Sequence, residues 1–284
     1  MAFINYLIHL AILICIYSIL TISLNFSVGF TGLLNLGHVG FFGIGAYTSA
    51  LMALNGIPIW QSILSGGFFA MISGILLALP TMRLKGDYLA LATLGFMFII
   101  GSVARNWTEI TRGALGIPGI PKIVRNNTEF LIIVFAIVIL TYLIFLFISR
   151  TRFGKTCQAI RDDETAVAVL GKNTYFYKVM SISISTFFAG IAGSLFVHHI
   201  NFIDPTVFDL EFFIFVISML IAGGLASLKG SVVGVFALSI ISEAMRYIVV
   251  SPSLIGAVRD MAYVVILILI LIFKPRGIFG KVDV

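Results

Sequence analysis

The sequence predicts an all-α, polytopic membrane protein, and three observations lead to this fold class. Of the 284 residues, 60% are hydrophobic and only 11% are charged, and the mean hydropathy is +1.13. A soluble domain is about one-quarter charged, so this chain cannot cover its surface with polar groups. The first charged residue is Arg83, and later charge-free stretches run over 88–104, 130–149, 179–203 and 212–228. This composition excludes a soluble enzyme, a nucleic-acid-binding protein and a disordered chain.

The apolar segments are expected to be helices. Each charge-free stretch has the roughly 17–25 residues that a helix needs to cross the hydrocarbon core. Only helices and closed barrels satisfy their own backbone in lipid, and the continuous apolar runs lack the strict alternation of a barrel strand. We expect one transmembrane domain over 1–284 with about nine spans, near 6–24, 38–54, 60–80, 88–105, 130–149, 179–200, 211–228, 231–250 and 255–273. A break in the first span would change the number to eight or ten.

The distribution of Lys and Arg predicts the orientation in the membrane. One set of alternate loops, which includes 150–178 and the residues after 273, carries twelve of these residues, and the other set carries six. Cytoplasmic loops carry the excess of Lys and Arg. This places loop 150–178 and the C-terminus in the cytoplasm and the N-terminus outside. The net charge of +6 then reflects loops that face an anionic inner leaflet.

No motif in the sequence supplies catalytic chemistry. It contains no GxSxG, HExxH or GxxxxGK[ST] pattern, so any ATP used in transport must bind to a different chain. Cys15 and Cys157 lie far apart without metal-ligand spacing, and we expect neither a metal site nor a cofactor. A membrane-embedded enzyme is therefore disfavoured. An ion-driven carrier is also disfavoured, because such carriers keep acidic residues in mid-membrane and these spans hold almost none.

The segment 25–47 is a candidate for the solute pathway. It contains six glycines in 23 residues, together with Asn25, Asn35 and His38, and would make a poor continuous helix. Irregular backbone at membrane depth is tolerated only inside protein or along a water-filled path. The candidate pathway residues are Asn35, Gly37, His38, Gly40 and, from a later span, Thr93. The alternative is that the small residues serve close helix packing.

The loop 150–178 is the best-defined element outside the predicted spans. Asp162, Asp163 and Glu164 open a short helical pattern, where carboxylates suit the free N–H groups of a helix start. An apolar run up to Leu170 follows, and Gly171 suits a left-handed C-terminal cap. A short, capped helix with an apolar patch is expected to dock on a partner. The alternative is that it lies on the bilayer surface.

A short internal similarity links two glycine-containing turns. The run GLLNLG at 32–37 is similar to GLASLKG at 224–230, and both precede an apolar span on the predicted cytoplasmic side. Transporters often contain duplicated halves, so the two turns could be equivalent elements of two repeats. The match is short enough that a shared turn solution would also explain it.

Four stretches together resemble a known family. They are TGLLNLGHVGFFGIGAY at 31–47, RLKGDYLALATLGF at 83–96, RTRFGKTCQAIRDDETAVAVLGKN at 150–173 and GGLASLKGSVVGV at 223–235, and the ending LILIFKPRGIFGK at 269–281 agrees as well. The chain resembles the LivM-type permease subunits of bacterial branched-chain amino-acid ABC importers. Related permeases for urea, amides and sugars share the glycine-rich start, so a permease for urea, amides or another small solute is the alternative. A stand-alone channel or secondary carrier is a further alternative.

The resemblance implies an assembly in the bacterial inner membrane. Its other members would be a second, LivH-like permease, two ATPase subunits that hold ATP and Mg, and an extracytoplasmic solute-binding protein. In such permeases the cytoplasmic loop docks on the ATPase, and the residues that correspond here are Arg161, Asp162, Asp163, Glu164, Ala166, Leu170 and Gly171. The family pattern Glu-Ala-Ala-x-x-x-Gly is only partly kept, because Thr165 stands in place of the Glu when Gly171 is aligned. No ion-pair role is carried over for that position.

Overall fold

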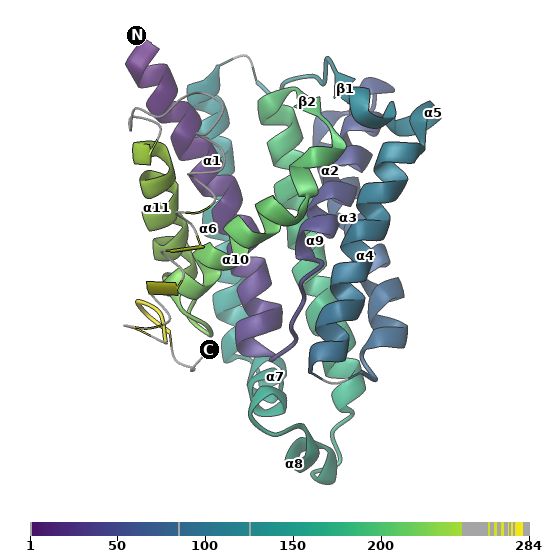
Figure 1. Ribbon diagram of the computed structural model, residues 1–284, viewed down its shortest axis with the longest axis vertical. Helices are drawn as coiled ribbons and strands as arrows, with labels where there is room; N and C mark the ends of the chain where they lie inside the picture. The colour runs from purple at the N-terminus through teal and green to yellow at the C-terminus, as the bar shows by residue number, and fades with distance from the viewer. Residues whose placement is uncertain are drawn as a thin grey trace.

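The computed structural model describes residues 2–84, 86–124, 126–245, 261, 264, 265, 268, 269, 272, 274 and 276–280, and shows a bundle of helices (Figure 1). The helices are α1 (Ala2–Asn25), α2 (His38–Leu54), α3 (Ile59–Thr81), α4 (Asp87–Asn106), α5 (Thr108–Thr111), α6 (Asn127–Arg150), α7 (Arg152–Asp162), α8 (Glu164–Val169), α9 (Thr174–Ile200), α10 (Leu210–Gly223) and α11 (Leu228–Met245). The shorter elements are a π-helix at Phe26–Phe30, 3-10 turns at Gly113–Leu115 and Pro205–Phe208, and the antiparallel strands β1 (Ile117–Pro118) and β2 (Phe202–Ile203).

The helical membrane fold predicted from the sequence is confirmed. Within the described residues, five helices are long and apolar enough to cross a membrane, and α2 and α10 are shorter apolar helices. The predicted span 211–228 was too long, because α10 ends at Gly223 and the chain turns at Gly224, where φ is +106°. The predicted span 255–273 lies largely outside the described residues, so the number of spans stays a prediction.

Helix α9 lies at the centre of the bundle, packed against α2 and α3. Most of its residues are buried. Glycines let the helices approach at backbone distance: a Cβ on Gly45 would lie 2.2 Å from the Gly190 carbonyl oxygen, and one on Gly193 would lie 1.9 Å from that of Phe42. Small residues at helix contacts allow this approach in membranes. These glycines of the 25–47 segment and α9 therefore serve packing.

The helix that begins as α1 changes character at Asn25. The π-helix follows, then residues 31–37 run without regular structure to the start of α2. The buried amide of Asn25 donates to the Ser231 hydroxyl at 2.7 Å and accepts from the Ala226 N–H at 3.0 Å. Asn25, which lies shortly before the first of the two similar turns, thus contacts the second, and each turn begins with a glycine at positive φ, Gly32 at +74° and Gly224 at +106°.

The two ends of the bundle differ. Helices α7 and α8 extend beyond it at the end opposite to the start of α1 (Figure 1). At the other end the β1–β2 pair, with Ile117 opposite Ile203, holds the loop between α4 and α6 against the top of α9. His198 reinforces this contact, since its Nδ1 lies 2.8 Å from the Pro121 carbonyl oxygen and its Nε2 lies 2.9 Å from the Ser49 hydroxyl.

Candidate functional site: the α7–α8 loop and the segment before α2

The loop predicted from the sequence forms two helices rather than one. Helix α7 begins after Thr151, whose hydroxyl accepts from the Gly154 N–H. Asp162 ends α7, so the expectation that it opens the following helix was wrong. Asp163, with an extended φ of −156°, separates the helices and is the N-cap of α8.

The predicted caps of the second helix are confirmed. The Asp163 carboxylate accepts from the backbone N–H of Thr165 at 2.9 Å and of Ala166 at 3.0 Å. Hydrogen bonds from the Thr165 hydroxyl and then from the Ala166 N–H hold the pKa of this exposed carboxyl below its ordinary value. At the other end Gly171 adopts φ +78°, and its N–H donates to Ala168 while the N–H of Lys172 donates to Val167, which is the Schellman arrangement.

The tip of this loop presents apolar side chains outward. Val167 is buried and holds α8 in place, whereas Val169 is 87% exposed and Leu170 is 79% exposed. Ala166 is also exposed. A capped turn that exposes two neighbouring large aliphatic side chains has a surface that gains from contact with another protein or with lipid.

Two charged contacts fasten the loop to the bundle. Glu164 accepts from Lys178 at 2.5 Å and from the Thr174 hydroxyl at 3.1 Å, which ties α8 to the first turns of α9. The Arg161 guanidinium pairs with Asp162 at 2.7 Å and donates to the Gly29 carbonyl oxygen at 2.9 Å. Because Gly29 lies in the π-helix, Arg161 connects α7 directly to the irregular segment before α2.

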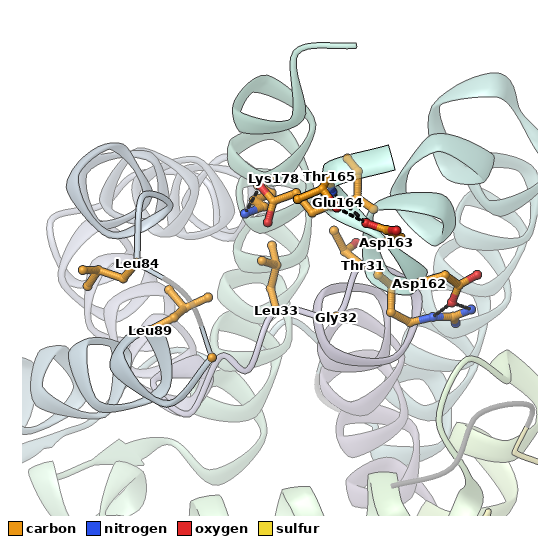
Figure 2. Close-up of a pocket in the computed structure, with 13 residues that line it drawn as sticks. Thr31, Gly32, Leu33, Leu84, Leu89, Asp162, Asp163, Glu164, Thr165 and Lys178 are labelled. Atoms are coloured by element: carbon orange, nitrogen blue, oxygen red, sulfur yellow. Dashed lines mark hydrogen bonds and ion pairs between the residues drawn. The ribbon is translucent and has the colours of Figure 1, made fainter. Parts of the chain in front are cut away.

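A pocket of about 290 Å³ lies between the loop and the bundle (Figure 2). One side comes from the segment before α2 and from the start of α4, and the other from α7, α8 and α9. The lining residues are Thr31, Gly32, Leu33, Leu84, Gly86, Leu89, Ile160, Arg161, Asp162, Asp163, Glu164, Thr165 and Lys178. The pocket therefore combines aliphatic walls with side chains of both charges.

Four of the candidate pathway residues meet in one cluster. The Thr93 hydroxyl accepts from the Leu36 N–H at 3.0 Å, and a Cβ on Gly37 would lie 2.2 Å from the Thr93 carbonyl oxygen. His38 Nε2 lies 3.0 Å from the Ser23 hydroxyl, and its Nδ1 lies 3.4 Å from the Asn35 amide nitrogen. These side chains are fully buried and fix the backbone of 31–37.

Gly40 lies apart from that cluster, packed against Met97 of α4, where an added Cβ would lie 3.3 Å from the Met97 Cα. Of the candidates, Asn35 keeps a spare acceptor, because its amide oxygen has no hydrogen-bond partner within the described part of the chain. The pocket reaches this segment at Thr31, Gly32 and Leu33, which lie just before Asn35 in the sequence.

Three residues of the site were not predicted from the sequence. Asn25 and Gly29 belong to the glycine-rich segment, but neither was among the candidate pathway residues. Lys178 was counted only as a loop charge, although its side chain is just 6% exposed. The position of Lys178 at the start of an apolar span was the signal that could have identified it. A buried ammonium needs an acidic partner, and Glu164 was the nearest loop carboxylate outside the Asp pair.

The family comparison agrees with this architecture. Residues 6–273 match the family model described as "Branched-chain amino acid transport system / permease component". The chain belongs to this permease family. It is 32% identical over 302 residues to the high-affinity branched-chain amino acid transport system permease protein LivM of Escherichia coli, covering 95% of this chain and 69% of that one.

More distant relatives are similar over almost the whole permease. The probable branched-chain amino acid transport permease protein LivM of Methanocaldococcus jannaschii is 24% identical, with 94% of this chain and 91% of that one covered. The LivH permease of Salmonella typhimurium is 25% identical, with 94% and 92% covered. Among solved structures, PsaBC from Streptococcus pneumoniae in complex with Fab shares the fold, with a TM-score of 0.50, 13% identity and 94% and 91% of the two chains covered.

Proposed function

We propose that this chain is the membrane-embedded permease subunit of an ATP-driven, binding-protein-dependent importer of branched-chain amino acids. Family membership and the 32% identity to the LivM permease support this function. The assembly would contain a second, LivH-like permease, two ATPase subunits that bind ATP and Mg, and an extracytoplasmic binding protein, in the inner membrane of a bacterium. This chain would contribute no ATPase site of its own.

The observation that carries the proposal is the construction of the α7–α8 loop. It is capped at both ends of α8, it exposes Val169 and Leu170, and it is fastened to the bundle by Arg161. A loop that only connected two spans would need neither the caps nor the exposed apolar tip. We assign the tip as the contact for the ATPase and the loop as the element that the ATPase moves.

Arg161 would carry that movement into the membrane. Its guanidinium holds the Gly29 carbonyl, and a Cβ on Gly32 would lie within 2.9 Å of its side chain, so α7 and the segment before α2 are in direct contact. A displacement of α7 would therefore shift residues 29–37, which end at the cluster of Asn35, His38 and Thr93.

The experiment is uptake of leucine into proteoliposomes that contain the complete assembly, with ATP inside and binding protein outside. Arg161→Met should leave the ATPase bound but abolish uptake, because the contact with Gly29 is lost. Arg83→Met, an exposed arginine at the same end of the bundle, is the matched control and should transport normally. Flux of leucine through the purified chain alone would contradict the proposal. Uptake of urea or an amide instead of leucine would contradict the assignment of the substrate.

A further inference from the structure

The pocket beside Lys178 combines aliphatic walls with charged side chains, and the proposed function gives it no role. Its floor is formed by Leu33 and Leu89, each 4% exposed, and by the Lys178 ammonium. Gly86 also lines it, and Leu84 lies beside Leu89 on the side of α4, as Figure 2 shows. It opens at the same end of the molecule as α7 and α8, which is the predicted cytoplasmic end.

Five charged side chains line the pocket, and two of them, Lys178 and Glu164, form an ion pair at its inner wall. Lys178 and Glu164 lie 2.5 Å apart, and their side chains are 6% and 32% exposed. The ion pair is thus desolvated on the lysine side and open to solvent on the glutamate side. A buried ammonium requires an anionic partner, and either the glutamate or an incoming carboxylate satisfies it.

We propose that this pocket is an inner binding site for a free amino acid with an aliphatic side chain. The ligand carboxylate would bind Lys178 and its ammonium would bind Glu164, so that one ion pair is replaced by two. The aliphatic side chain would lie against Leu33, Leu84 and Leu89. This inference rests on the proposed function for the class of amino acid, because the imported product is the amino acid that accumulates on this side.

The size of the pocket limits the ligand. Its volume of about 290 Å³ lies at the lower end of the ~300–1,000 Å³ typical of small-molecule sites. This space is large enough for one amino acid. The mixed lining also selects against simple ions, because an anion would meet Asp163 and Glu164 and a cation would meet Lys178.

Occupation of the site has a consequence for transport. Glu164 and Lys178 join α8 to α9, so a ligand between them changes the distance between the loop and the bundle. Amino acid on the inner side then acts on the element that the ATPase is proposed to move. Uptake should slow as internal leucine rises, while external leucine, held by the binding protein, has no such effect.

The binding test uses the complex of permeases and ATPases in nanodiscs without binding protein, with radiolabelled leucine in equilibrium dialysis. The wild-type complex should bind leucine saturably. 4-Methylpentanoate lacks the ammonium and 3-methylbutylamine lacks the carboxylate, so each should compete at least about tenfold more weakly, since a charged hydrogen bond is lost. Lys178→Met should weaken leucine binding by a similar factor, and the charge-matched control Arg83→Met should leave it unchanged.

A second variant guards against a folding defect. Leu84→Trp keeps every charge and fills the pocket, so it should abolish leucine binding while the complex still assembles. Equal leucine binding by wild type, Lys178→Met and Leu84→Trp would overturn the inference, as would the absence of binding by the wild type at millimolar leucine. Normal ATP-dependent uptake together with either of these results would leave the proposed function intact and refute only the inner site.

Discussion

Truncation of Leu170 tests the docking surface quantitatively. Leucine has three more carbon atoms than alanine, and each buried CH₂ contributes about 0.8 kcal/mol. Leu170 is 79% exposed in the isolated chain, so its full burial on a partner should contribute roughly 2 kcal/mol beyond alanine. Leu170→Ala should therefore weaken association with the ATPase about thirtyfold, because 1.4 kcal/mol corresponds to a factor of ten.

The assay is titration of the fluorescently labelled ATPase against the permease pair in nanodiscs. Leu115→Ala is a close control, because Leu115 is also 79% exposed but lies at the opposite end of the bundle. Its affinity for the ATPase should equal that of the wild type. The reasoning is refuted if Leu170→Ala binds within twofold of the wild type, or if Leu115→Ala is the variant that loses affinity.

Three further predictions concern stability and pH. Gly193→Ala should destabilise the bundle by about 3 kcal/mol or more, because the added Cβ would lie 1.9 Å from a backbone oxygen. The Cβ of Gly95→Ala would meet nothing within 4 Å among the described atoms, so this variant should be neutral or stabilising by up to about 1 kcal/mol. Thermal unfolding in detergent compares the two variants, and equal melting temperatures would contradict the packing. Asn25→Ala should cost about 1–3 kcal/mol in the same assay, because it removes a buried amide that four groups contact, and an unchanged melting temperature would argue against the turn contact. At pH values above the ordinary pKa of an aspartate, the ionised Asp163 carboxylate stabilises α8. Because the pKa of Asp163 is lowered in the folded state, this stabilisation is lost as the pH falls through that lower value. The protection of 165–169 against hydrogen exchange, taken relative to the intrinsic exchange rate at each pH, should therefore fall on acidification below about pH 4, and Asp163→Asn, which keeps the acceptor, should remove that dependence.

The sequence predicts most of the spans because lipid leaves few alternatives. A charge-free stretch of sufficient length has to be a helix, and the helices α3, α4 and α6 begin and end within a few residues of the prediction. The caps at Asp163 and Gly171 were also predictable, since each satisfies a local backbone requirement that its residue type fits.

Features that depend on distant partners were not predictable. The turn after α10 is held by a hydrogen bond from the Ala226 N–H to Asn25, which lies 201 residues away in the sequence. The pocket arises because the segment before α2, the start of α4 and the α7–α8 loop come together. No local pattern marks it, and Lys178 acquires its role only from Glu164.

The glycine-rich segment shows both outcomes at once. Its irregular course was predictable, because glycines and polar residues disfavour a continuous helix. The sequence could not show which glycines serve packing and which lie along a path, because this depends on the helix that each glycine faces. Gly45 faces Gly190 at backbone distance, whereas Gly32 faces the Arg161 side chain of α7.

The most direct test of the central claim is the location of residue 169. In a background of Cys15→Ala and Cys157→Ala, Val169→Cys places a single thiol on the exposed tip of the loop. We predict that a membrane-impermeant maleimide fails to label it in intact cells, and that a short bifunctional reagent in inverted vesicles crosslinks it to the ATPase subunit. Labelling from outside, or a crosslink to the binding protein, would contradict the account.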